Sequence, residues 1–161
     1  MLLPILRWPD PRLSQPCAPA VLDDALRALA ADMLETMYAA PGRGLAAPQV
    51  GHLVRMFVMD VAWKTGTPAP MVFVNPEVEL LGTLVSGAEG CLSIPGPLTE
   101  VERSALVRVR WTDLQGQRQE AVLDGFAAIC VQHEYDHLDG ILTLDRLSPE
   151  ARAKAEAEVL A

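Results

Sequence analysis

The sequence predicts an α+β fold: a single domain over residues 1–161, with mixed or antiparallel strands around a buried helix. Three observations support this fold class. The chain has 161 residues and half of them are apolar, which suffices for one hydrophobic core but not comfortably for two. Strand-like segments are scattered among two or three helical ones, as in α+β domains. One apolar helical segment contains His-Glu-Tyr-Asp-His, a spacing typical of helices that bind a metal.

The first quarter of the chain is expected to form an extended arm and then a helix. Prolines recur through residues 1–20, which disfavours regular structure there. A helix is expected from about Asp23 to Tyr38, because apolar residues then recur every three or four positions. These residues are Leu22, Leu26, Leu29, Met33 and Met37. The two methionines favour core packing over a soft-metal or cofactor face.

The middle of the chain is expected to form strands. Leu53 to Asp60 and Met71 to Val74 are apolar and rich in residues that favour strands. Leu106 to Trp111 alternates apolar residues with outward-facing arginines. The segment Asp113 to Gly116 supplies a hairpin turn before a return strand that ends near Leu123.

Two further helices are expected in the last quarter of the chain. The first begins near Gly125 and continues through His137, and its apolar beginning indicates a largely buried helix. The second follows Ser148 and Pro149, which suit the N-cap and the first helical position.

Composition excludes several classes of protein. The formal net charge is -8 and basic residues do not cluster, so direct nucleic-acid binding is not expected. Prolines interrupt the apolar N-terminal stretch, which is therefore not read as a signal peptide. No apolar run approaches the roughly 20 residues that cross a bilayer, so no membrane association is expected. Three cysteines do not suggest a disulfide framework, and a reducing cytoplasm is the simplest compartment. At this size we expect a monomer.

The strongest chemical signal lies in the first of the two later helices. His133 and His137 are four residues apart and project from one face, so both imidazoles can reach one metal ion. Glu134 lies one step round the helix, close enough to act on a water molecule without being a ligand. The alternative is a chance pair of histidines on a surface helix.

A metal held by two histidines needs at least one more protein ligand. Cys91 lies in Glu89 to Pro95, a segment typical of a loop or strand end that presents a thiol. A thiolate is a good ligand for zinc or ferrous iron. Cys17 lies in the proline-rich arm, and Cys130, three positions before His133, is better explained as a small packed hydrophobe.

Three segments together resemble the motifs of bacterial-type peptide deformylases, in that family's order. They are Gly42-Arg43-Gly44-Leu45-Ala46-Ala47-Pro48-Gln49, Glu89-Gly90-Cys91-Leu92-Ser93 and Gln132-His133-Glu134-Tyr135-Asp136-His137. The likeness extends to Ile5 through Leu13, Asn75-Pro76 and Leu147-Ser148-Pro149, and so covers nearly the whole chain.

The resemblance implies metal-dependent hydrolysis of the formyl group on the formyl-methionine of nascent polypeptides, with release of formate. It makes Cys91, His133 and His137 the metal ligands. Glu134 would take a proton from water and return it to the departing amine. Gln49 and the backbone N–H of Leu92 would stabilise the negative charge on the formyl oxygen. Without the family, Gln49 is better explained as a loop amide that bonds the backbone.

The resemblance also assigns the substrate pocket. Gly44 would lie alongside the peptide, and its lack of a side chain permits that approach. Phe126, Ile129 and Cys130 would line the methionine pocket. Arg43 replaces a usual Ile or Val at the pocket, and Gly87 replaces a common branched aliphatic residue. These departures keep a second hypothesis open, a paralogue that acts on other N-acyl peptides or small amides. A third is an inactive relative that binds peptides or metal.

The roles of two acids stay open between alternatives. Asp136 is expected either to accept a hydrogen bond from a ligating histidine or to hold the helix, the alternative being an outward solvated acid. Glu89 is expected to fix the cysteine segment through the backbone or through a basic partner such as Arg103.

A Cys-His-His set accepts one divalent ion, and the resemblance favours Fe²⁺ over Zn²⁺, Ni²⁺ or Co²⁺. The short last helix balances Arg152 and Lys154 with acids, which predicts at most weak, salt-sensitive ribosome contact.

Overall fold

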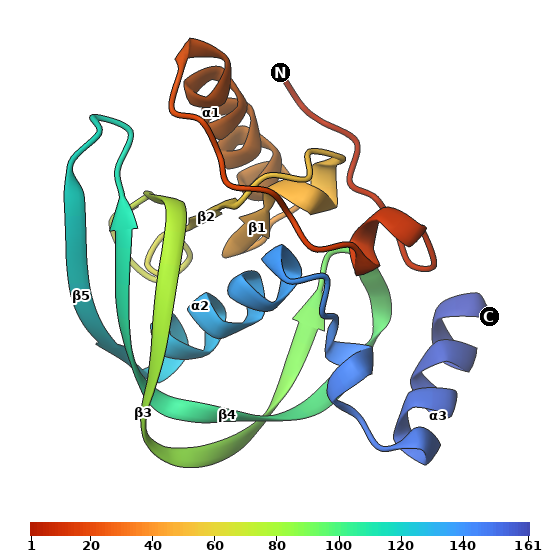
Figure 1. The fold of residues 1–161 in the computed structure, drawn as a ribbon. Coiled ribbons are helices and arrows are strands. Elements are labelled where there is room, and N and C mark those ends of the chain that lie inside the picture. The colour runs from red at the N-terminus through yellow and green to blue at the C-terminus, as the bar shows by residue number, and fades with distance from the viewer.

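One antiparallel sheet of five strands, in the order β1-β2-β3-β4-β5, forms the body of the molecule (Figure 1). The computed structural model describes residues 1–161. The strands are β1 (Gly44–Ala46), β2 (Met56–Met59), β3 (Met71–Cys91), β4 (Ile94–Thr112) and β5 (Arg118–Asp124). The helices are α1 (Asp24–Ala39), α2 (Gly125–Leu138) and α3 (Pro149–Leu160), with short 3-10 turns at Pro11–Ser14, Ala47–Val50 and Thr143–Arg146. The predicted α+β class is confirmed.

The expected bounds of the helices agree with the structure to within a residue or two. Asp23 caps α1, and its carboxylate accepts the backbone N–H of Leu26 at 2.8 Å. Ser148 caps α3 by accepting the N–H of Ala151 at 3.2 Å. Met33 and Met37 are fully buried in the cluster that joins α1 to β2, which confirms core packing for both.

Strands β3 and β4 are far longer than the sequence indicated. The expected segments at 71–74 and 106–111 are parts of strands of 21 and 19 residues, which form one long hairpin. Register shifts between Val74 and Glu77, Leu81 and Leu84, and Glu89 and Cys91 interrupt the pairing. Such bulges bend a strand and increase its twist. The hairpin accordingly curves around α2 (Figure 1).

Helix α2 lies at the centre of the molecule because its first two turns, through Val131, are apolar. Ala128, Cys130 and Val131 pack with aromatic and branched residues of the sheet, including Phe57 and Phe73. Burying each large apolar side chain contributes about 1.5–3 kcal/mol, so this packing holds the helix firmly against the strands. None of the helices combines the length and apolar character needed to cross a membrane.

Candidate metal centre

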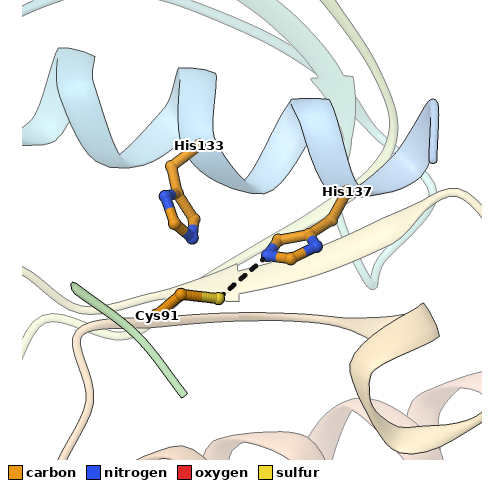
Figure 2. Close-up of side chains that lie close together, drawn as sticks. All are labelled: Cys91, His133 and His137. Atoms are coloured by element: carbon orange, nitrogen blue, oxygen red, sulfur yellow. Dashed lines mark hydrogen bonds between the residues drawn. The ribbon is translucent and has the colours of Figure 1, made fainter. Parts of the chain in front are cut away.

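Three potential metal ligands meet between α2 and the tip of the β3–β4 hairpin. The ligand atoms of Cys91, His133 and His137 all lie within 4.8 Å of one another. Figure 2 shows both imidazoles extending from α2 toward the thiol of Cys91. The Cys91 sulfur and His137 Nε2 are 3.5 Å apart. The structure therefore brings together the three residues that the sequence predicted as ligands.

Local folding explains this convergence. His133 and His137 are one helical turn apart and so share a face of α2. Cys91 is the last residue of β3, where the chain turns into β4 and Cys91 pairs with Ile94. The turn is anchored by Trp8, whose N–H donates to the Ser93 carbonyl at 2.8 Å. The thiol is thus presented by a pinned hairpin and not by a free loop.

A buried carboxylate fixes the orientation of His133. Its Nδ1 is 3.0 Å from Glu89 Oε1, and because a carboxylate only accepts, Nδ1 carries the proton. Nε2 is therefore the ring nitrogen that can present a lone pair to a metal. Burial alone would raise the pKa of Glu89, but hydrogen bonds from His133 and Arg103 hold it below its ordinary value, so Glu89 stays charged.

Arg103 links Glu89 to Asp136. It donates to both oxygens of Glu89, at 2.9 and 3.0 Å, and to Asp136 Oδ2 at 2.6 Å. Asp136 also accepts two hydrogen bonds from the Arg146 guanidinium, at 2.8 and 2.6 Å. The expected pairing of Glu89 with Arg103 is confirmed. Of the alternatives for Asp136, direct acceptance from a histidine and a solvated position are wrong, because Asp136 is only 7% exposed and Glu89 is the acceptor for His133. Its bonds to Arg103 and Arg146 agree with the remaining alternative, that it holds the helix.

The charges around the three donors suit a cation. Burial would lower the pKa of His133, but the Glu134 carboxylate and the Cys91 sulfur raise it well above its ordinary value, so the site attracts positive charge. Burial lowers the pKa of His137 well below its ordinary value, which leaves that ring neutral. One thiol and two imidazoles form a donor set that binds Zn²⁺ or Fe²⁺, and three protein ligands leave a position open for reaction. The residues present therefore fit a metal.

Glu134 lies beside the donors and is only 4% exposed. Its Oε1 is buried and has no hydrogen-bond partner, which is uncommon for a native carboxylate. Burial raises the pKa of the Glu134 carboxyl to about 7. A Cβ added at Gly44 would lie 2.5 Å from Glu134 Oε2 and 2.8 Å from the Cys130 sulfur. Gly44 therefore leaves room for the carboxylate, a reason for glycine that the sequence did not suggest.

Gln49 combines both interpretations made from the sequence. Its Oε1 accepts the N–H of Ala46 at 3.0 Å, as a loop amide would. That bond orients Nε2, which donates to Ser93 Oγ at 3.0 Å and lies 3.7 Å from the Cys91 sulfur. The backbone N–H of Leu92, in the hairpin turn, has no backbone acceptor. Two donors thus flank Cys91.

A cavity of about 650 Å³ opens onto the metal centre. All of the proposed substrate-binding residues line it, namely Arg43, Gly44, Phe126, Ile129 and Cys130. The lining also includes Gln49, Cys91, Leu92, His133 and Glu134. Cys130 is both a wall residue and, as expected, a packed one, since it is 6% exposed and belongs to the sheet–α2 core. The Arg43 guanidinium lies over the Phe126 ring, 5.0 Å from its centroid.

Three residues of the site were missed from the sequence. Ser93 positions the Gln49 amide, and its place directly after the cysteine motif was an available signal. Arg146 holds Asp136, and Lys64 lines the cavity. Neither has a local sequence signal, because both reach the site through the tertiary fold.

A Cys-His-His set, a buried carboxylate with one oxygen that lacks a partner, and an adjoining cavity define a metal-dependent hydrolase. Comparison with known proteins is more specific. The sequence pattern of the polypeptide deformylase family matches residues 2–153. The chain belongs to the peptide deformylase family.

Individual relatives agree over nearly the whole chain. A peptide deformylase of Alkalilimnicola ehrlichii is 50% identical over 154 residues, covering 95% of this chain and 86% of that protein. A peptide deformylase of Mesorhizobium japonicum is 51% identical over 147 residues, covering 90% of this chain and 84% of that protein. Among solved structures, a peptide deformylase from Legionella pneumophila superposes with a TM-score of 0.93 at 39% identity, covering 99% of this chain and 94% of that one.

Proposed function

We propose that this chain removes the formyl group from the N-terminal formyl-methionine of nascent polypeptides, with Cys91, His133 and His137 holding one divalent metal ion. The single observation that carries the proposal is the convergence of these three donors beside the buried Glu134, at a cavity sized for a peptide end. A divalent metal held there would supply Lewis acidity, which would make a water molecule easier to deprotonate near neutral pH and so a better nucleophile.

Glu134 is proposed as the general base and acid. It takes the proton of the attacking water, and it delivers a proton to the amine nitrogen as the bond to the formyl carbon breaks. A pKa of about 7 supports both halves of this role, because the carboxyl then accepts and releases a proton near neutral pH. The unpartnered Oε1 supports it further, since that oxygen is free to bond a reacting group.

Gln49 and Leu92 are proposed to stabilise the negative charge that develops on the formyl oxygen. Electrostatic stabilisation of this kind requires donors that are oriented before reaction. The Gln49 amide is held at both ends, by the N–H of Ala46 and by Ser93 Oγ, and it flanks Cys91. The N–H of Leu92 follows Cys91 directly and is free of a backbone acceptor.

The substrate is proposed to lie as an extended chain between Gly44 and the free side of β3. Residues Val85 to Glu89 pair with β4 alone, so the other edge of β3 is open toward the cavity. The methionine side chain would enter between Phe126, Ile129 and Cys130. Burial raises the pKa of the Cys130 thiol well above its ordinary value, so it stays an uncharged wall for a thioether.

Ferrous iron is proposed as the metal in the cell, with zinc, nickel and cobalt as ions that the same donors accept. A thiolate ligand exposes such a centre to oxidation, so anaerobic handling should preserve activity. A cytoplasmic location, a monomeric state and weak, salt-sensitive ribosome contact complete the proposal. The structural support for weak contact is α3, whose Arg152 is already paired with Asp145 and Glu156.

The direct test is anaerobic turnover of formyl-Met-Ala-Ser by protein loaded separately with Fe²⁺, Ni²⁺ and Zn²⁺. We expect release of formate with iron or nickel and slower release with zinc. Arg43 at the rim favours one competing function, a paralogue for other N-acyl peptides. Turnover of acetyl-Met-Ala-Ser in preference to the formyl peptide would establish that alternative. A relative from Synechococcus elongatus, solved in complex with actinonin, superposes with a TM-score of 0.91 at 40% identity, so actinonin should inhibit this chain.

A further inference from the structure

Two cations line the cavity without any carboxylate partner. Arg43 and Lys64 both border it. Apart from Arg7, every other arginine forms an ion pair. In a chain with 21 acids and 13 basic residues, an unpaired arginine at a cavity is an unusual placement. The Arg43 guanidinium instead lies over Phe126, and the Lys64 ammonium lies 5.6 Å from the centroid of the Trp63 ring.

Both cations are held on the same rim. The indole N–H of Trp63 donates to the Gly42 carbonyl at 2.9 Å, and the N–H of Asp60 donates to the Arg43 carbonyl at 2.9 Å. The Asp60 carboxylate accepts the N–H groups of Ala62, Trp63 and Ala69, at 3.0–3.1 Å. The loop that carries Lys64 is therefore tied directly to the segment that carries Arg43.

The acids around the cavity do not neutralise this rim. Of the residues that line it, only Glu89 and Glu134 are acidic. Glu89 is bonded to Arg103 and His133, and Glu134 is buried beside the metal ligands. The lining segment Val85 to Ala88 carries no charged side chain, and Glu100, which accepts the Ser86 hydroxyl, does not line the cavity.

From this arrangement we infer that Arg43, assisted by Lys64, binds a carboxylate of the peptide substrate, so that the enzyme prefers formyl-methionyl peptides with Asp or Glu shortly after the methionine. The inference rests on the proposed deformylase function, because it places methionine in the apolar part of the cavity and later residues at the rim. A guanidinium matches a carboxylate with two parallel hydrogen bonds, and the contact with the Phe126 ring holds the Arg43 guanidinium in place before the substrate binds.

The carboxylate could come from a side chain or from the end of a short peptide, and amidated peptides separate the two sources. The probes are formyl-Met-Ala-Asp-amide, formyl-Met-Asp-Ala-amide and the Asn counterpart of each. We expect the better Asp peptide to exceed its Asn counterpart in kcat/KM by about 1.5- to fivefold at low salt, the range of a partly exposed charge pair. The ratio should fall toward one as salt shortens the Debye length.

Charge variants identify the residue responsible. Arg43→Met should bring the Asp/Asn ratio near one, Arg43→Lys should keep part of it, and Arg43→Glu should favour a Lys peptide instead. A purely structural role of the Arg43 stem on Phe126 would not invert the preference. Lys64→Gln should reduce the ratio and serves as the second variant if Arg43 variants fold poorly. Arg110→Met, whose partner is Glu120 on the distant hairpin, is the matched control and should leave the ratio unchanged.

An Asp/Asn ratio of one in the wild-type protein, with good turnover of formyl-Met-Ala-Ser-amide, would overturn the inference and leave the deformylase function intact. A preference for the free acid over the amide of formyl-Met-Ala-Ser, without any Asp preference, would also overturn it, by assigning the rim to terminal carboxylates. Absence of turnover on every formyl peptide by metal-loaded protein would remove the proposed function itself.

Discussion

Replacing Gly44 with alanine tests how closely the Glu134 carboxylate must be held. The new Cβ would lie 2.5 Å from Glu134 Oε2 and 2.8 Å from the Cys130 sulfur, and real Cβ contacts stay beyond 3.0 Å. The carboxylate must therefore move by about half an ångström or more. Displacements on the order of 1 Å at a reacting group lower rates about 100-fold, so we expect kcat to fall roughly 10- to 100-fold.

The same change should affect stability much less than turnover. The atoms displaced are the ends of the Glu134 and Cys130 side chains and not backbone, so we expect a loss of about 1 kcal/mol, at the low end for overpacking. The assay is kcat on formyl-Met-Ala-Ser, with metal content and urea unfolding measured on the same preparation. Gly66→Ala is the matched control, since Gly66 lies outside the cavity and a Cβ there meets only the Ala62 carbonyl oxygen, at 3.7 Å, so kcat should stay unchanged. A Gly44→Ala protein with full metal and kcat within twofold of wild type would refute the reasoning.

Three further predictions concern stability. Arg103→Met leaves the buried carboxylates of Glu89 and Asp136 without the guanidinium that pairs with them, and should lower the free energy of unfolding, measured by urea titration, by about 3–5 kcal/mol. Arg108→Met breaks a partly exposed ion pair and should lower it by less than about 1 kcal/mol. Burial and then the Asp60 hydrogen bond raise the pKa of Tyr38 to about 12, so its contribution to stability is complete below pH about 10, its ordinary value, and is lost as the pH rises through about 12. The stability difference from Tyr38→Phe should shrink over that interval, and a Tyr38 phenol that ionises near pH 10 by absorbance would contradict this. Removing the metal with a chelator should lower the melting temperature by roughly 5–10 °C, relative to protein in a free metal concentration of 100 times Kd, as measured by calorimetry. In His137→Ala, the melting temperatures with metal and with chelator should be the same.

Helices could be predicted closely because their signals are local. The apolar stripe and Asp23 define α1, and Ser148 with Pro149 defines the start of α3. The long hairpin could not be predicted, because residues 75–105 lack a clean alternation of buried and exposed side chains. Leu80 and Leu84 are more than half exposed, and their strand is set by pairing with β4 and by its bulges.

The metal site likewise has a part that could be predicted from the sequence, the ligands, and a part that could not, the acceptor for His133. The spacing of His133 and His137 and the family motifs predicted that Cys91 would join them, and the structure brings the three together. The sequence offered Asp136 as one possible acceptor for a ligating histidine, but the hairpin places Glu89, 44 residues away in sequence, against the His133 ring. Such a partner depends on strand register, which short-range patterns do not specify.

The most direct test of the account is a paired measurement of metal content and formate release in wild-type protein and in Glu134→Gln, both prepared anaerobically with iron. The account predicts one metal per chain in both proteins and at least about a 1,000-fold lower kcat in the variant, because the ligands are intact while proton transfer is lost. A variant that keeps its metal and turns over formyl-Met-Ala-Ser within tenfold of wild type would contradict the role of Glu134. Wild-type protein without a bound metal that still releases formate at full rate would contradict the metal centre.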